Sequence, residues 1–116
     1  MERLHRVWKL SFLMLSLLER KRNNMTKLNE NDIRKKLKYL EGWDLVDRQI
    51  ERNFTFDTFL DGIDFVNKIS KIAEEQNHHP DLDIRYNKIK CRMMSHDVSS
   101  ITDRDFNLAQ ALNFIY

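Results

Sequence analysis

The sequence predicts a single α+β domain in which a four-stranded antiparallel sheet carries helices packed on one face. Four short segments alternate apolar and polar residues as strands do, and three longer segments repeat apolar residues at helical spacing. A chain of 116 residues can form one core but not two. The predicted order is α-β-β-α-β-β-α, and because one face of so small a sheet must be buried against helices, the other stays open.

The first helix is predicted over residues 30–41. Asn29 suits its N-cap and Gly42 stands where a helix commonly ends, while the apolar residues that recur at helical spacing are Ile33, Leu37 and Leu40. Two strand-like segments follow at residues 43–46 and 49–56. The polar pair Asp47-Arg48 separates them, which predicts a hairpin.

The second helix is the longest and is predicted from an N-cap at Asp57 to about Gln76. Its expected apolar face contains Phe59, Ile63, Val66 and Ala73, backed by Phe65, Ile69 and Ile72. Pro80 disfavours helical geometry at the preceding residue. The helix is therefore expected to end before His78 and His79 and to deliver both into a defined loop.

A second hairpin is predicted after this loop, with Asn87-Lys88 as its turn. The alternating residues are Leu82, Ile84 and Tyr86 on one strand, and Ile89, Cys91, Met93 and Ser95 on the other. His96 has the opposite parity on the last strand, so it is expected to project from the face away from the core. Thr102 and Asp105 then form a capping box for a final helix whose inward residues are Leu108, Ala109, Leu112 and Ile115.

Charge and cysteine content narrow the class of protein. Residues 1–24 hold six Lys or Arg against two Glu, a net charge of +4, whereas residues 25–116 hold fourteen against sixteen Asp or Glu, a net charge of −2. Nucleic-acid binding needs clustered excess Lys and Arg, so no direct nucleic-acid binding is expected of the domain. The single cysteine, Cys91, can form no internal disulfide, which favours the cytoplasm.

The first 24 residues differ in kind from the rest of the chain. An apolar run at residues 10–18 lies between basic flanks and is far shorter than the roughly 20 residues that a membrane span needs, so no membrane is expected as a partner. We predict that residues 1–24 are an N-terminal extension outside the fold and that residues 25–116 are the domain. A targeting segment is the alternative for the extension.

Three of the four histidines lie at two places, His78-His79 and His96. Histidine can give or take a proton near neutral pH, because its unperturbed pKa is about 6.5. The grouping predicts either proton chemistry or metal ligation. Neither His78 nor His96 is expected to be a core residue.

Seven short motifs occur in order along residues 28–116. They are Gly42-Trp43, Phe54-Thr55-Phe56, Ala73-Glu74, Asn77-His78-His79-Pro80, Tyr86-Asn87-Lys88, Ser95-His96 and Arg104-Asp105. This ordered set resembles the pterin-4a-carbinolamine dehydratase family, which in animals is also a dimerisation cofactor of a homeodomain transcription factor. Two positions depart from the family pattern: Leu82 stands where an aromatic residue is usual, and Val98 where vertebrate members have Cys.

The resemblance implies a dehydratase that converts 4a-hydroxytetrahydropterin to quinonoid dihydropterin and water, without a metal or other cofactor. It implies that His78 and His96 are the acid–base pair, that His79 orients the ligand and that Glu74 tunes an imidazole. Asp105 is expected to help hold His96. The implied pterin-binding residues are His78, His79, Pro80, Ser95, His96, Asp97, Val98 and Asp105.

The resemblance also implies partners and leaves two other hypotheses open. A homodimer or homotetramer is expected, serving an aromatic amino acid hydroxylase in recycling of the tetrahydropterin cofactor. One alternative is a metal site made by the three histidines with Asp97 or Glu74, although no recognised ligand spacing supports it. The other is a binding or dimerisation module without turnover, which a direct assay would distinguish.

Overall fold

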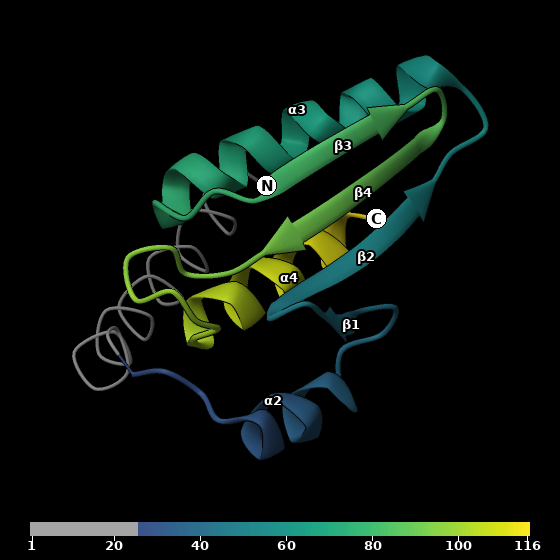
Figure 1. The fold of residues 1–116 in the computed structure, drawn as a ribbon. Helices are drawn as coiled ribbons and strands as arrows, with labels where there is room; N and C mark the ends of the chain where they lie inside the picture. The colour runs from purple at the N-terminus through teal and green to yellow at the C-terminus, as the bar shows by residue number, and fades with distance from the viewer. Residues whose placement is uncertain (1–25) are drawn as a thin grey trace, which may run out of the picture.

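The computed structural model describes residues 26–116, which have the predicted α+β architecture (Figure 1). The elements in chain order are α2 (Glu30–Leu37), β1 (Asp44–Val46), β2 (Gln49–Thr55), α3 (Phe59–Gln76), β3 (Asp81–Arg85), β4 (Lys88–Met93) and α4 (Asp103–Ile115). The order α-β-β-α-β-β-α is confirmed. The predicted N-terminal extension lies outside the described residues.

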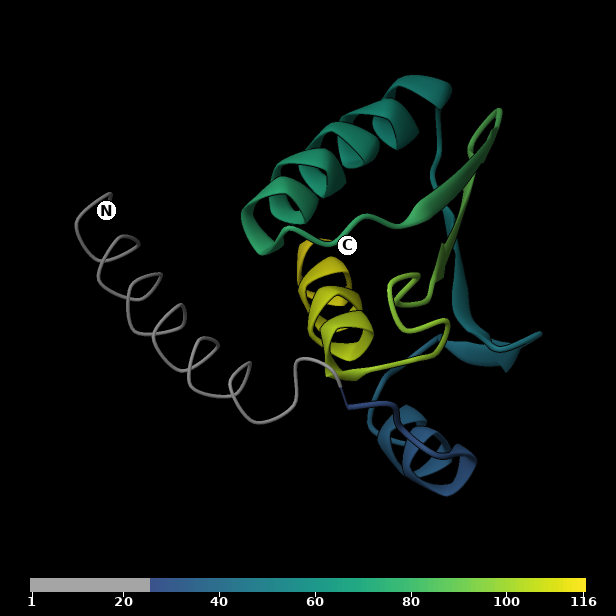
Figure 2. The same cartoon turned by 60° about the vertical axis from the view of Figure 1, so that its left-hand side comes forward.

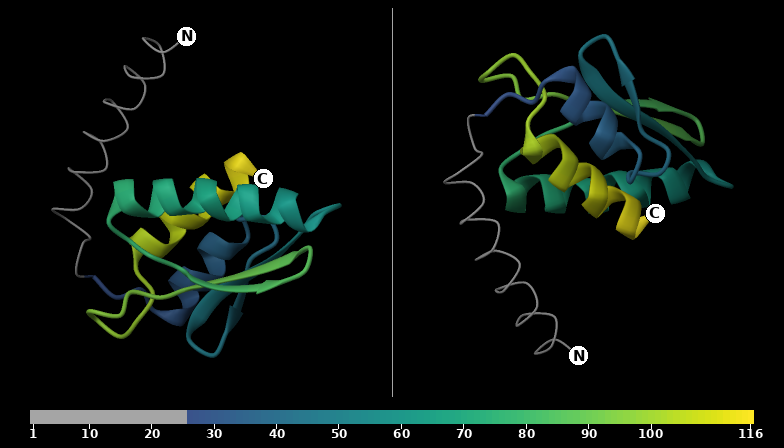
Figure 3. Two further views of the ribbon diagram at one scale, coloured as in Figure 1. Left: turned by 90° about the horizontal axis from the view of Figure 1, so that it is seen from above. Right: turned by 90° about the horizontal axis from the view of Figure 1, so that it is seen from below.

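The four strands form one antiparallel sheet in the order β1-β2-β4-β3. Each hairpin contributes two neighbouring strands, and the β2–β4 pairing joins the hairpins. Helices α3 and α4 pack on one face of this sheet, and α2 lies at the β1 end (Figure 2). Viewed from above and below, α3 and α4 lie against each other over the same face (Figure 3).

Both hairpins have two-residue turns, but only one is the predicted turn. Asp47 and Arg48 have φ values of 49° and 66°, which is the type I′ geometry that matches the twist of paired strands. In the second hairpin Arg85 pairs with Lys88, so Tyr86 and Asn87 form the turn, and the predicted turn at Asn87-Lys88 is wrong by one residue. The register accounts for the shift, because it pairs Ile84 with Ile89, of which Ile89 is fully buried and Ile84, on the edge strand, is 42% exposed.

The ends and faces of the helices differ from prediction in detail. Helix α2 ends at Leu37, and Gly42 instead serves a later turn with φ of 84°, where an added Cβ would lie 2.5 Å from Arg52 Nε. The N-cap of α3 is Thr58 in place of Asp57, because its hydroxyl accepts from the Asp61 amide at 3.1 Å.

The buried face of α3 is also rotated from the predicted one. Phe59 is 47% exposed, and the buried residues are Gly62, Phe65, Ile69 and Ala73. A Cβ built at Gly62 would lie 3.5 Å from Ile89 and 3.6 Å from Phe56. The helix therefore approaches the sheet closely on the side of Gly62, and this close contact determines which face of the helix is buried.

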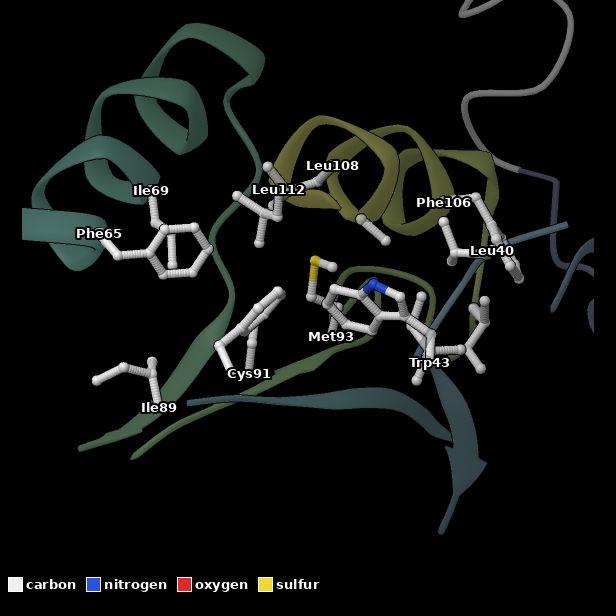
Figure 4. Close-up of a cluster of buried hydrophobic side chains, with 14 of the residues drawn as sticks. Leu40, Trp43, Phe65, Ile69, Ile89, Cys91, Met93, Phe106, Leu108 and Leu112 are labelled. Carbon is white, nitrogen blue, oxygen red and sulfur yellow. The ribbon is translucent and has the colours of Figure 1, made fainter. Parts of the chain in front are cut away.

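The core lies between the sheet and α3 and α4 (Figure 4). The sheet contributes side chains of alternating residues, and the helices contribute Phe65, Ile69, Leu108 and Leu112. The Phe54 ring packs against the Phe65 ring in a tilted arrangement, at a centroid distance of 4.8 Å, and meets Trp43 edge-on at 6.1 Å. The inward residues predicted on the last helix are confirmed, with Leu108, Ala109 and Leu112 fully buried.

The open face of the sheet is strongly polar. A shallow hollow of about 330 Å³ on it is lined by Asn53, Asp83, Arg85, Lys88, Lys90 and Arg92. Within residues 26–116, no helix is both long enough and apolar enough to cross a membrane. The homodimer or homotetramer that the resemblance implies stays a prediction.

Candidate active site

The C-terminus of α3 directs two adjacent histidines in opposite directions. Asn77 takes the left-handed conformation, with φ of 50° and ψ of 42°, and its N–H donates to the carbonyls of Ala73 and Glu74. The His78 amide also donates to the Ala73 carbonyl, at 3.0 Å. This left-handed cap turns the chain so that His78 is only 8% exposed, whereas the His79 side chain is 56% exposed.

His78 forms a buried pair with Asp105, the third residue of α4. Its Nε2 lies 2.6 Å from Asp105 Oδ1, and Asp105 is fully buried. The other carboxylate oxygen accepts from the Ser95 hydroxyl at 3.0 Å and from the Thr102 amide at 2.9 Å. Asp105 therefore binds His78, where the sequence interpretation expected His96, and the expectation that His78 lies outside the core is wrong.

The hydroxyl groups near Asp105 donate their protons toward its carboxylate. Backbone and Nε groups of Arg104 donate to Thr102 Oγ1, at 3.2 and 3.4 Å, so the Thr102 hydroxyl must give its own proton to Ser95, 2.7 Å away. Ser95 in turn donates to Asp105. A carboxylate in this position only accepts, so the proton of the neutral His78 ring belongs on Nε2. Its Nδ1 then keeps a free lone pair that can take a proton.

His79 and Glu74 form a second imidazole–carboxylate pair, on the surface. His79 Nε2 lies 3.3 Å from Glu74 Oε1, and both side chains are exposed. Glu74 was expected to tune an imidazole, and the ring that it contacts is His79. Water screens such an exposed pair, so its contribution to stability is small.

His96 lies in a turn rather than on the last strand. Strand β4 ends at Met93, and an isolated bridge between Ser95 and Ser100 closes a turn over residues 96–99. His96 is exposed, but the parity argument does not apply to it, because the strand does not extend that far. The bridge holds this turn, because Ser95 and Ser100 exchange backbone hydrogen bonds of 2.8 and 3.3 Å.

Asp97, the next residue in that turn, is bound to α4. Arg104 Nη2 donates to Asp97 Oδ1 at 2.6 Å. This hydrogen bond, together with the charge of the guanidinium, holds the pKa of Asp97 below its usual range. Asp97 is therefore a carboxylate at neutral pH and fixes one side of the His96 turn.

Two structural features bear on what the site can bind. Neither the hollow on the open face nor a second one of about 400 Å³ beside α2 is lined by a histidine. Among the described residues, no group of three or more His, Cys, Asp or Glu side chains is placed to hold a metal ion. The metal hypothesis gains no support, and the roles that the resemblance implies for the three histidines stay predictions.

The network behind His78 contains residues whose part the sequence interpretation missed. Thr102 was identified only as a helix cap, yet its hydroxyl also binds Ser95. Ser95 itself is fully buried, with its hydroxyl engaged on both sides. The capping-box motif was the visible signal for Asp105, but it carried no information about His78.

The fold and this site define a small α+β protein with an imidazole–carboxylate pair suited to proton transfer. A family model described as pterin 4 alpha carbinolamine dehydratase matches residues 26–115. The chain belongs to this family.

Relatives agree with the assignment. A protein of Sulfolobus acidocaldarius is 38% identical over 89 residues, covering 77% of this chain and 98% of that protein. One from Herpetosiphon aurantiacus is 45% identical over 80 residues, covering 69% and 83%. The names of both assign them to pterin-4-alpha-carbinolamine dehydratase. A crystal structure of a transcriptional coactivator/pterin dehydratase from Brucella melitensis is similar with a TM-score of 0.75 and 29% identity, covering 78% of this chain and 98% of that one.

Proposed function

We propose that this protein dehydrates 4a-hydroxytetrahydropterin to quinonoid dihydropterin and water. The carbon–oxygen bond at C4a breaks, a proton is delivered to the departing hydroxyl, and a proton leaves the adjacent ring nitrogen as the carbon–nitrogen double bond forms. The atoms balance without an oxidant, a reductant or a cofactor. Two positioned groups that exchange protons near neutral pH are sufficient for this reaction.

The observation that carries the proposal is the buried His78–Asp105 pair. The carboxylate orients the imidazole and fixes the proton of the neutral ring on Nε2, which leaves Nδ1 as the nitrogen that can accept a proton. His96, exposed on its turn, is the proposed second member of the acid–base pair. His79, held by Glu74, is the proposed donor that orients the pterin.

The remaining proposed site residues divide by exposure. Asp97 is exposed and Pro80 and Val98 are half-buried in the two loops, and all three are proposed to contact the pterin. Ser95 and Asp105 are fully buried, so we assign them a supporting role behind His78. Leu82, partly buried against the core, cannot stack on a ring as an aromatic residue could.

The test is a dehydratase assay on the full chain, with the 4a-hydroxy substrate supplied by an aromatic amino acid hydroxylase. His78→Gln keeps an N–H donor for Asp105 but cannot exchange a proton, and His96→Ala removes the second ring. Each is expected to lower kcat by roughly 10²–10⁴-fold, the usual contribution of a positioned acid or base. Lys68→Ala, on the exposed side of α3, is the control. Near-full rates in both histidine variants would exclude the acid–base assignment.

The wider setting follows from the chemistry. Quinonoid dihydropterin must be reduced before it serves a hydroxylase again, so the proposed role is recycling of a tetrahydropterin cofactor, with an aromatic amino acid hydroxylase as the enzyme served. The proposed location is the cytoplasm, supported by a single cysteine that can form no internal disulfide. The proposed assembly is a homodimer or homotetramer, supported by the uncovered sheet face and its free edges.

A binding role is the second candidate. The Brucella relative is named as a transcriptional coactivator as well as a pterin dehydratase. A protein that associates with a partner but fails to accelerate dehydration would favour this role over the enzyme.

A further inference from the structure

Arg104 connects the two parts of the proposed site. Its guanidinium Nη2 donates to Asp97 Oδ1 at 2.6 Å, and its Nε donates to Thr102 Oγ1 at 3.4 Å. The side chain is only 19% exposed. It therefore lies in a defined place between the His96 turn and the beginning of α4.

The position of this cation is unusual for a helix. Arg104 is the second residue of α4, where the exposed N–H groups already create positive potential. The other charged residues of this first turn, Asp103 and Asp105, are acidic, as the helix dipole favours. The helix dipole thus gives no reason for an arginine here, whereas the Asp97 carboxylate does.

On one side, Arg104 fixes the turn that carries His96. Asp97 follows His96 directly, and the ion pair attaches this turn to α4. The Ser95–Ser100 bridge holds the base of the turn, but it does not fix the turn against the helix. The side chain of Arg104 supplies that second attachment.

On the other side, Arg104 acts on the buried pair through hydroxyl groups. Its amide and Nε both donate to the Thr102 hydroxyl, which leaves that hydroxyl free to donate only to Ser95. Ser95 then donates to Asp105, the partner of His78. The Arg104 side chain thus contacts the network behind one histidine through the Thr102 hydroxyl and fixes the turn that carries another.

We propose that Arg104 is a positioning residue for the dehydration, holding the His96 turn in register with the His78–Asp105 pair without touching the pterin itself. The proposal rests on the proposed function. The lowered pKa of Asp97 agrees with the short ion pair.

Steady-state kinetics of the full chain test it. Arg104→Gln is expected to lower kcat by roughly 10- to 100-fold, the cost of misplacing a catalytic group, with KM changed less than about threefold. Arg104→Lys keeps the charge for Asp97 but loses the guanidinium that donates to Asp97 and Thr102 at once, so an intermediate kcat is expected. Asp97→Asn should lower kcat by the same factor as Arg104→Gln, and kcat of the double variant should be no lower than that of either single variant. The matched control is Arg34→Gln, which removes an exposed ion pair of 2.8 Å with Glu30 in α2.

Histidine side-chain NMR is a second measurement, which needs no turnover and also shows whether a variant is folded. Imidazole nitrogen resonances of His78 and His96 should shift in Arg104→Lys and Asp97→Asn, while those of His79 should not. Unchanged kcat and unchanged resonances in the Arg104 variants, with an active parent protein, would overturn this proposal alone. A raised KM with normal kcat in Arg104→Gln would mean that Arg104 contacts the substrate directly and would also overturn it. An inactive parent protein would instead overturn the proposed function, and with it any catalytic meaning of Arg104.

Discussion

Replacing Asp105 with Asn tests how much the fold and the chemistry depend on one buried carboxylate. Asparagine has the same shape and keeps an oxygen for the Thr102 amide and the Ser95 hydroxyl. Its amide group, however, faces His78 Nε2, where the carboxylate oxygen lay at 2.6 Å. Two N–H donors cannot share that contact, so either the hydrogen bond is lost or His78 moves its proton to Nδ1.

The loss of stability and the loss of activity can be estimated separately. A hydrogen bond to a charged group contributes roughly 1.5–3 kcal/mol, so we expect Asp105→Asn to lower the free energy of unfolding by about 2 kcal/mol. For a domain of this size that corresponds to a fall in Tm of roughly 10 °C. If His78 changes tautomer, the lone pair on Nδ1 is lost as well. A similar change behind the histidine of a serine protease lowers kcat about 10⁴-fold, and because His78 is one of two proposed acid–base groups we expect roughly 10²–10³-fold here.

Thermal unfolding followed by circular dichroism measures the first effect, and the dehydratase assay below the new Tm measures the second. Asp103→Asn is the matched control, since Asp103 lies in the same helical turn but only forms a partly exposed ion pair of 3.0 Å with Lys36. We expect its Tm and kcat to stay near those of the parent protein. If Asp105→Asn were as stable and as active as that control, the reasoning about the buried pair would be refuted. Lost stability with normal kcat would reduce Asp105 to a structural residue.

Three further predictions concern other parts of the chain. Burial raises the pKa of the Cys91 thiol to about 12, and nearby Asp81 adds to this; a disulfide reagent at pH 8 should therefore react only after denaturation, and rapid labelling of the native protein would contradict this. Asn77→Ala should lower the free energy of unfolding by about 1–2 kcal/mol, because the residue is left-handed, whereas Asn77→Gly should be tolerated in the same unfolding assay. The Arg104 contact depresses the pKa of Asp97 in the folded state, so the stabilisation from this contact is present above the unfolded pKa of 3.8 and is lost as the pH falls below it. When Tm is measured against pH, the Tm of Asp97→Asn should therefore fall less steeply in that acidic window than the Tm of the parent protein. Parallel curves would count against the ion pair.

Local patterns in the sequence were sufficient to predict the elements and their order. Alternation of residues such as Ile50, Phe54, Ile89 and Cys91 reflects the period of a strand, and each is buried as that period requires. The capping box at Thr102 and Asp105 and the turn at Asp47-Arg48 were also predicted, because short-range hydrogen bonds and backbone geometry determine them. The position of His78 and His79 just after the end of α3 was also predicted, from Pro80.

What depends on packing between distant segments could not be predicted. The buried face of α3 was set by how closely Gly62 approaches Ile89, and the turn at Tyr86-Asn87 by the register across the sheet. His78 and Asp105 are 27 residues apart, and nothing local indicates that the carboxylate which caps α4 will also hold this imidazole. Arg104 is a surface-type residue in the sequence, and only the proximity of Asp97 and Thr102 in the folded chain assigns it a place. Sequence period and capping chemistry therefore determined the elements of this protein, whereas the partners of its histidines were decided by the tertiary structure, because hydrogen bonds between separate elements exist only once the core has brought those elements together.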